Sequence, residues 1–427
     1  MEMKKYKFIS ANEYCVRVFD GTHDSPKPCE KGYKLLTSKN ILAGELDKTS
    51  AYYISENDYN AINQRSKVQQ YDILFSMIGS VGNVCFVKDS NIDFAIKNMG
   101  VFSCENKEKA LYLYYYLQSP FAKKMIDSYL NGAVQKFLGL ERLRNFPILE
   151  YSTDKQKIAA ILSSLDDKIV LNKKINAKLE AMAKRLYDYW FVQFDFPNEE
   201  GKPYKTSGGK MVWNEVLKRE IPEGWEVVQI KKIFENEIPG DWGEEQQKKN
   251  NTYQVSCIRG CDMVTMNDLP IRYILPSNAT KLLKPNDFVI EISGGSPTQS
   301  TGRIVQITEE IINRFNGNVI CSNFCHGVRI LNKKYISYFL RMWNMFYDNK
   351  VFFNYEGKTS GLKNFQFDTF VENKWYMPPE DIVKKYDLTV NKIKAKIDKN
   401  ESENLKLTAM RDRLLPLLMN GQGEVEG

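Results

Sequence analysis

The sequence has little histidine, little cysteine and no long apolar run. Its 427 residues include two histidines and eight cysteines. So few cysteines cannot form a disulfide scaffold in a chain of this length, and two histidines leave little room for histidine-dependent catalysis. No stretch approaches the ~18 apolar residues that cross a membrane, and the N-terminal residues lack the apolar core of a signal peptide. We therefore expect a cytoplasmic protein without a membrane span.

The remaining composition is that of a globular protein. Apolar residues make up 43% of the chain and charged residues 26%, which argues against disorder. At roughly 100–200 residues per domain, the length allows several domains. The net charge of +7 permits a nucleic-acid partner without requiring one.

Two long segments, 153–195 and 380–420, have the periodicity of coiled-coil helices. Apolar or amide residues recur in each at spacings of three and four, which is typical of a heptad repeat. We expect the following residues to pair the helices or to bind partners: Leu165, Ile169, Asn172, Asn176, Leu179, Met182 and Leu186 in the first, and Ile393, Ile397, Asn400, Asn404, Leu407, Met410 and Leu414 in the second. The spacing also allows Arg411 in place of Met410.

The two helical segments resemble each other in sequence. Adding 228 to a residue number between 168 and 186 gives its match in the second segment, and ten of these nineteen positions are identical. The paired asparagines are among them, and a buried asparagine fixes register and partner choice in a coiled coil. We interpret the pattern as an internal duplication.

Each helical segment follows a longer segment that mixes short apolar strands with helices and Gly/Asn/Pro turns. The predicted fold is α+β, with mixed domains at 1–152 and 223–379, the long helices at 153–195 and 380–420, a polar linker at 196–222 and a frayed tail at 421–427.

No catalytic motif is complete. Gly357-Lys358-Thr359 resembles the end of a phosphate-binding loop, but Phe352 occupies the position of the first glycine. Cys257/Cys261 and Cys321/Cys325 form two C-x3-C pairs. Zinc binding by these pairs stays open, although buried free thiols are favoured because C-x2-C is the usual zinc spacing.

Polar loops recur in both mixed domains. Arg and Lys suit guanine edges and phosphates, and Asn and Gln suit adenine edges. We therefore predict DNA contacts from Lys39, Asn40, Arg65, Lys67, Lys97, Asn98, Gln135 and Lys136 in the first domain, and from Arg259, Gln299, Arg303, Lys358, Ser360 and Lys363 in the second.

Several segments resemble the specificity subunits of type I restriction-modification systems. In the central helix these are the run 158–169, Asn172, Asn176 and the run 187–191. Phe194-Asp195-Phe196-Pro197 and Ile221-Pro222-Glu223-Gly224-Trp225 are similar to the family's entry into its second domain. Asp20-Gly21-Thr22-His23-Asp24 and Asp72-Ile73-Leu74-Phe75-Ser76 resemble one of the family's types of first domain. The resemblance is specific in the central helix and the linker, moderate in the first domain and weak in the second.

The resemblance implies a division of labour. Two target-recognition domains each read one half of a bipartite site in double-stranded DNA. Two antiparallel helices, related by a pseudo-twofold repeat, set the spacer and dock two modification (methyltransferase) subunits. S-adenosylmethionine, ATP and Mg belong to the modification and restriction (translocase/nuclease) subunits. The resemblance thus implies that the chain itself is not an enzyme and binds no cofactor, and it assigns no metal ligand.

The second long helix departs from the first. It has Asp398, Lys399, Glu401 and Glu403 in place of Val170, Leu171, Lys173 and Ile175, so the two helices need not bind partners equally. Two alternatives stay open: a coiled-coil scaffold that binds proteins without reading DNA, and an independent nuclease or methyltransferase. The missing catalytic motifs make the latter the weaker.

Overall fold

The computed structural model describes residues 7–42, 44–130, 137–150, 155–266, 268–294, 298–359 and 362–419. The chain forms two compact units. Unit 1 comprises residues 1–175 and 399–427, and unit 2 comprises residues 176–398. The division passes through both long helices, α6 (Lys155–Tyr187) and α10 (Glu380–Met419), so each unit contains a mixed domain and a part of each helix.

Unit 1 combines short strands with helices that precede α6. The strands are β1 (Lys7–Ser10), β2 (Arg17–Asp20), β3 (Tyr33–Thr37), β4 (Ile41–Leu42), β5 (Glu45–Leu46), β6 (Tyr52–Ile54), β7 (Ile73–Ser76), β8 (Val84–Phe86), β9 (Phe94–Lys97), β10 (Met99–Ser103) and β11 (Pro147–Glu150). The helices are α1 (Ala11–Tyr14), α2 (Glu56–Ser66), α3 (Lys107–Gln118), α4 (Pro120–Leu130) and α5 (Leu140–Arg144).

These strands form three main groups in unit 1. The largest is an antiparallel sheet in the order β2-β10-β7-β8. In a second sheet, β6-β3-β9, strand β3 is antiparallel to β6 and parallel to β9. Strands β1 and β11 form an antiparallel pair. Helices α3 and α4 bury aromatic and aliphatic side chains against β7 and β8 and make the main core of the unit.

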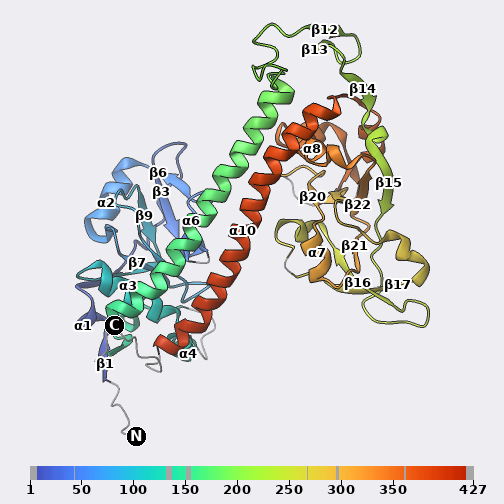
Figure 1. The fold of residues 1–427 in the computed structure, drawn as a ribbon. Helices are drawn as coiled ribbons and strands as arrows, with labels where there is room; N and C mark the ends of the chain where they lie inside the picture. Colours follow the sequence, from blue (N-terminus) through green and yellow to red (C-terminus); the bar gives the residue numbers. More distant parts are fainter. Residues whose placement is uncertain are drawn as a thin grey trace. The chain divides into compact units, whose positions relative to one another are not determined.

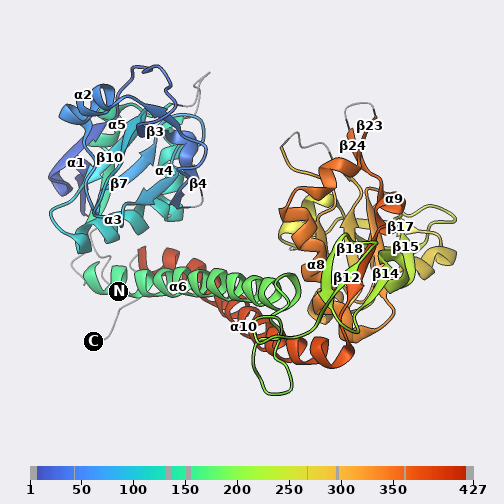
Figure 2. The same cartoon turned by 90° about the horizontal axis from the view of Figure 1, so that it is seen from above.

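Unit 2 likewise combines short strands with helices that precede α10. The strands are β12 (Met211–Asn214), β13 (Arg219–Pro222), β14 (Glu226–Gln229), β15 (Phe234–Pro239), β16 (Tyr253–Ile258), β17 (Ile271–Ile274), β18 (Phe288–Glu291), β19 (Ser293–Gly294), β20 (Ile304–Gln306), β21 (Val319–Cys321), β22 (Cys325–Ile330), β23 (Glu356–Thr359), β24 (Leu362–Phe365) and β25 (Lys374–Met377). The helices are α7 (Glu309–Arg314), α8 (Ile336–Asp348) and α9 (Phe367–Val371). The β23–β24 hairpin projects from the body of this unit (Figure 2).

The three main groups of unit 1 have counterparts in unit 2. The antiparallel order β15-β22-β18-β20 matches β2-β10-β7-β8. In β17-β16-β21, strand β16 is antiparallel to β17 and parallel to β21, as β3 is to β6 and β9. The pair β14–β25 matches β1–β11. Equal strand order and direction in two domains is what the predicted duplication requires.

Local conformation agrees as well. Tyr71 and Asn286 precede the strands β7 and β18, and both have positive φ values, of 71° and 77°. The next residue in each case is a buried aspartate that accepts a backbone hydrogen bond, Asp72 from Gln69 and Asp287 from Lys284. The same tight turn therefore introduces the central strand of both domains.

The two long helices run side by side and antiparallel within each unit (Figure 1). In unit 1, Asp166 meets Arg411 and Asn172 meets Asn404, so residue numbers rise along one helix as they fall along the other. In unit 2, Asn176 Nδ2 donates to the carbonyl of Ile397 at 3.5 Å. The predicted pair of mixed domains with long antiparallel helices is confirmed.

The segment 196–222 differs from the open polar linker that we expected. It contains the antiparallel hairpin β12–β13, and its Phe196 and Ile221 are buried in the core of unit 2. A short π-helix (Asp188–Val192) at the end of α6 buries Trp190 and Phe191 in the same core. The sequence analysis missed these few buried apolar residues because polar residues dominate the composition of the segment. Among the described residues, no helix is long and apolar enough to span a membrane.

Candidate nucleic-acid interface

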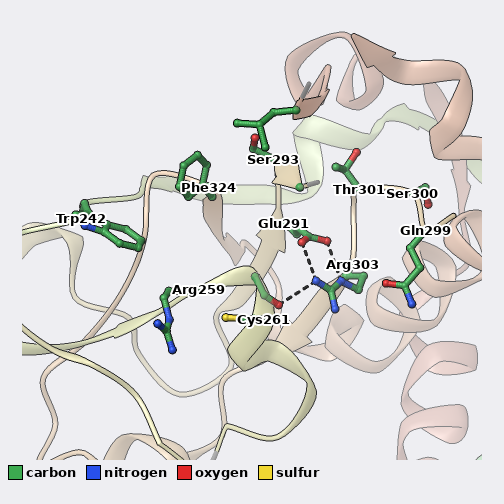
Figure 3. A pocket seen from close by; sticks show the side chains of 13 residues that line it. Trp242, Arg259, Cys261, Glu291, Ser293, Gln299, Ser300, Thr301, Arg303 and Phe324 are labelled. Atoms are coloured by element: carbon green, nitrogen blue, oxygen red, sulfur yellow. Dashed lines mark hydrogen bonds and ion pairs between the residues drawn. The ribbon is translucent and has the colours of Figure 1, made fainter. Parts of the chain in front are cut away.

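Three of the predicted residues of the second domain line one pocket of unit 2. Arg259 lies between β16 and the 3-10 helix η4 (Gly260–Val264), while Gln299 and Arg303 lie in the connection between β18 and β20. The pocket that they line has a volume of about 390 Å³. Segments that are far apart in the sequence therefore bring these side chains to one place (Figure 3).

Arg303 forms a double ion pair inside this pocket. Its Nε donates to Glu291 Oε2 at 2.8 Å, and its Nη2 donates to Glu291 Oε1 at 2.7 Å and to the carbonyl of Gly260 at 3.0 Å. The hydrogen bonds that Arg303 donates to the carboxylate of Glu291 raise the pKa of Arg303. Arg303 thus ties η4 to β18, a positioning role that the sequence did not suggest.

Arg259 is also paired. Its Nε and Nη2 each donate to the carboxylate of Asp262 at 2.8 Å, and this hydrogen bonding raises the pKa of Arg259. Asp262 also accepts the backbone N–H of Arg259, which caps η4. Much of the arginine charge is neutralised within the domain.

Lys363 lies in β24 and is largely buried. Its Nζ is 3.2 Å from Glu356 Oε2 and 3.2 Å from the carbonyl of Gln299, and it sits over the ring of Phe353. It links the β23–β24 hairpin to the loop of Gln299. Ser360 and the side chain of Lys358 lie outside the described residues.

In unit 1, Asn40 has a structural role. It closes the 3-10 helix η1 (Ser38–Asn40), is buried, and accepts the backbone N–H of Thr37 while donating to the carbonyl of Asp47. A side chain that is used up in this way cannot reach a base edge. The capping box of η1 corresponds to that of η4, so the two turns occupy equal places in the two domains.

Arg65 and Asn98 belong to a polar cluster around His23. The ring nitrogens of His23 lie 2.8 Å from Asn98 Oδ1 and 3.0 Å from Asp20 Oδ2. Arg65 Nη2 donates to the carbonyl of Gly21 at 3.0 Å, and Nη1 is 3.5 Å from Asp20. The structure brings together residues from β2, α2 and the β9–β10 turn, as a binding face requires.

The remaining basic side chains of unit 1 differ in their surroundings. Lys97 contacts the hydroxyl of Ser25. Lys39 and Lys67 are exposed, and no ion pair with another described residue engages either one. Gln135 and Lys136 lie outside the described residues.

The predicted DNA contacts did not include several side chains at these loops, namely Asp20, His23, Trp242, Glu291 and Phe324. Two glycines of the sequence, Gly21 and Gly240, could have pointed to these side chains. A Cβ at Gly21 would lie 2.5 Å from the carbonyl oxygen of Ile96, and one at Gly240 would lie 2.0 Å from that of Ser322. Both domains therefore need glycine where the loop after the first sheet strand approaches its neighbour, and aligning these glycines would have matched His23 with Trp242.

The predicted helix residues fall into three groups. Ile169, Asn172, Asn176 and Asn400 are buried, and Met182 and Met410 are exposed by 56% and 52%. The others are half-buried, namely Leu165, Leu179, Leu186, Ile393, Ile397, Asn404, Leu407 and Leu414. The two methionines therefore do not belong to the buried seam, where Arg411 lies in place of Met410.

The cysteines do not behave alike. Cys257, Cys321 and Cys325 are buried free thiols, whereas Cys261 is exposed, so the expectation of buried thiols was wrong for this one residue. Burial raises the pKa of Cys257 to about 12. Within the described ranges, no group of three or more Cys, His, Asp or Glu side chains could hold a metal ion.

Comparison with known proteins bears on this architecture. Residues 27–181 match the family model "Type I restriction modification DNA specificity domain". The type I restriction enzyme MjaIX specificity subunit of Methanocaldococcus jannaschii is 27% identical over 328 residues, which are 74% of this chain and 69% of the relative. Through this match and this relative, the chain is similar to the specificity subunits of type I restriction-modification systems.

Two further specificity subunits resemble this chain, one over a short segment and the other over nearly its whole length. The HindI specificity subunit of Haemophilus influenzae is 54% identical over 41 residues, which are 10% of this chain and 9% of the relative. The crystal structure of the S subunit from M. genitalium aligns with a TM-score of 0.55 at 14% identity, covering 96% of this chain and 95% of that one. The latter shows a shared fold.

Proposed function

We propose that this chain is the DNA sequence-recognition subunit of a type I restriction-modification complex. Each mixed domain reads one half of a bipartite site in double-stranded DNA, and the paired helices set the spacer. The observation that carries the proposal is the repeated topology, in which equal strand ends of both domains bear the polar loops. The match of residues 27–181 to the family model and the similarity to the MjaIX specificity subunit support it.

The partner subunits supply the chemistry in this proposal. Two modification subunits dock on α6 and α10 and bring S-adenosylmethionine, and restriction subunits bring ATP and Mg. The chain itself contributes recognition and no catalysis, and it acts in the cytoplasm. The exposed Met182 and Met410 occupy matched positions on the two helices. Because flexible methionine side chains adapt well to a partner surface, they suit docking of the modification subunits.

In this proposal two kinds of side chain bind the DNA, namely exposed lysines and arginines that are already paired within the domain. Lys39 and Lys67 are available to phosphates, whereas Arg259 and Arg303 present guanidinium groups that carboxylates hold in place. An arginine whose charge is partly neutralised attracts the DNA backbone less strongly. Because its donors are fixed in position, it is better suited to distinguishing one base edge from another.

A methylation map of host DNA, with and without this gene, tests the proposal. We expect a site made of two short blocks separated by a fixed number of unspecified bases. One continuous block, or no gene-dependent methylation pattern in a strain whose modification subunit is intact, would favour the scaffold alternative.

A single substitution tests the assignment of the first domain. Lys39→Ala should weaken binding of the complex, and the slope of log affinity against log salt should fall by about one if the lysine contacts a phosphate. Lys218→Ala in unit 2 is the control, because that exposed lysine pairs locally with Glu215 outside the predicted face. If the two substitutions change the affinity and its salt dependence equally, Lys39 does not contact the DNA.

A further inference from the structure

The pocket of unit 2 has an aromatic side that the predicted DNA contacts do not explain. Trp242 follows β15, and Phe324 lies between β21 and β22. Their ring centroids are 6.0 Å apart at an interplanar angle of 74°. Phe324 is 45% exposed although it is a large apolar side chain. Figure 3 shows both rings on one side of the pocket, with Gln299, Ser300 and Thr301 on the other.

Trp242 is held in place by buried charge. The guanidinium of Arg272 lies 4.8 Å from the ring centroid, and Arg272 in turn pairs with Glu245 at 3.1 Å. Arg272 is buried, so the ring rests on a fixed support. An aromatic surface that is already ordered loses little conformational entropy when a ligand stacks on it.

The Glu291–Arg303 pair lies between the aromatic and the polar side of the pocket (Figure 3). The guanidinium uses Nε and Nη2 for Glu291 and Gly260. No hydrogen bond to another described residue engages its Nη1 group, which can donate to a ligand. A flat ligand with an acceptor at its edge therefore meets both a stacking surface and a charged donor in this cavity.

We infer that this pocket receives one unstacked nucleobase from the half-site of the second domain. The inference rests on the proposed function and adds a site to it. Every nucleobase has a π face that stacks on aromatic side chains and ring or carbonyl acceptors that a guanidinium recognises. The cavity, at about 390 Å³, lies within the usual size range of small-molecule sites.

This arrangement is absent from the described residues of the first domain. At the position of Trp242 it has His23, whose ring nitrogens are bound by Asp20 and Asn98. Between β9 and β10 it has only Asn98, so nothing corresponds to Phe324. We therefore place the unstacked base in one half-site only, which gives the experiment an internal control.

The test uses the full chain assembled with its modification subunits and a DNA duplex that contains the mapped site. 2-Aminopurine replaces each purine in turn, pyrrolocytosine replaces each cytosine, and permanganate reports unstacked thymines. We expect one position outside the methylated bases to become unstacked, and only in the half-site of the second domain. Phe324→Ala should abolish that signal and weaken binding about tenfold.

Two further variants control for folding and chemistry. Trp242→Phe keeps an aromatic ring and should keep a reduced signal. Trp213→Ala removes another exposed aromatic ring of unit 2, in β12, and should leave the signal unchanged. Thermal unfolding of each complex checks that the variants fold.

Three outcomes would overturn the inference. Specific binding of both half-sites with no such position would overturn it and leave the proposed function intact, as would a signal that Phe324→Ala does not alter. Binding without any half-site preference would overturn both.

Discussion

The types of residue in the sequence were enough to predict the polar loops, but not which groups their side chains would bind. Arg259, Arg303 and Asn40 were predicted from the sequence as DNA contacts, and the structure engages each of them inside its own domain. Glu291 lies in the strand before the loop of Arg303, and only the antiparallel pairing of β18 with β20 brings the two together. Such pairing depends on tertiary structure, so no local pattern could have revealed it.

Asp72 provides a pH test at the residue scale. Burial raises its pKa to about 6 from the usual 3.8, although Ser103 and the backbone of Gln69 donate to it. Between about pH 4 and 6 the folded chain keeps a proton that the unfolded chain releases. The free energy of unfolding of unit 1 should therefore decrease as the pH rises through this window, by roughly 3 kcal/mol at most.

Asp72→Asn removes this titration while keeping the size and polarity of the side chain. Urea unfolding of both proteins between pH 4 and 8 should show the wild type losing stability relative to the variant as the pH rises. Asp127→Asn changes an exposed carboxylate of α4 and should give a profile parallel to the wild type. Parallel profiles for Asp72→Asn as well would mean that Asp72 ionises normally in the fold.

At the scale of elements, periodicity found both long helices but not every contact between them. Heptad spacing allowed either Met410 or Arg411 at one buried position, and the structure has Arg411 there because Asp166 faces it. The buried Asn172 donates to Glu403 and Asn404, as expected of an amide that fixes register. Its Oδ1 has no partner among the described residues, so this specificity costs some stability.

Asp166 joins three elements of unit 1. Arg411 Nη1 donates to it at 2.9 Å from α10, and the hydroxyl of Tyr115 donates to it at 2.7 Å from α3. Asp166→Ala leaves a buried hydroxyl and a half-buried guanidinium without this acceptor. We expect the free energy of unfolding in urea to fall by roughly 2–4 kcal/mol.

The neighbouring Asp167 is a matched control. It pairs with Lys88 at 2.6 Å, but both side chains are exposed by more than half, at 62% and 53%. An exposed ion pair contributes at most about 1 kcal/mol, so Asp167→Ala should change stability little. Similar losses for the two alanine variants would show that Asp166 does not connect the helices to α3.

At the scale of the whole molecule, the layout of domains and helices could be predicted, and the strand pairing could not. The two helices share residues at seam positions, such as Ile169/Ile397 and Asn172/Asn400, because a seam demands apolar and amide residues at fixed spacing. The two domains share the order of their strands but little of their sequence. An exception is the pair Gly82 and Gly302, which both have a φ of 95°. Pairs such as β1 with β11 join chain ends about a whole domain apart, which local patterns do not encode.

The proposed role of the helices predicts how the recognised site changes when they are lengthened. Seven residues inserted after Ile175 in α6, and seven after Asp398 in α10, add two helical turns to each while preserving the heptad phase. Each helix grows by about 10.5 Å, which corresponds to about three base pairs. Sequencing of methylated DNA should then show unchanged half-sites with a spacer up to about three base pairs longer.

The same insertion elsewhere separates length from mere disturbance. Seven residues placed between Glu200 and Gly201, in a turn outside both helices, should leave the spacer unchanged. Insertion into α6 alone shifts its residues against α10, separates Asn176 from Ile397 and should abolish methylation. An active double insertion that still methylates the original site would mean that the helices do not set the distance between the half-sites.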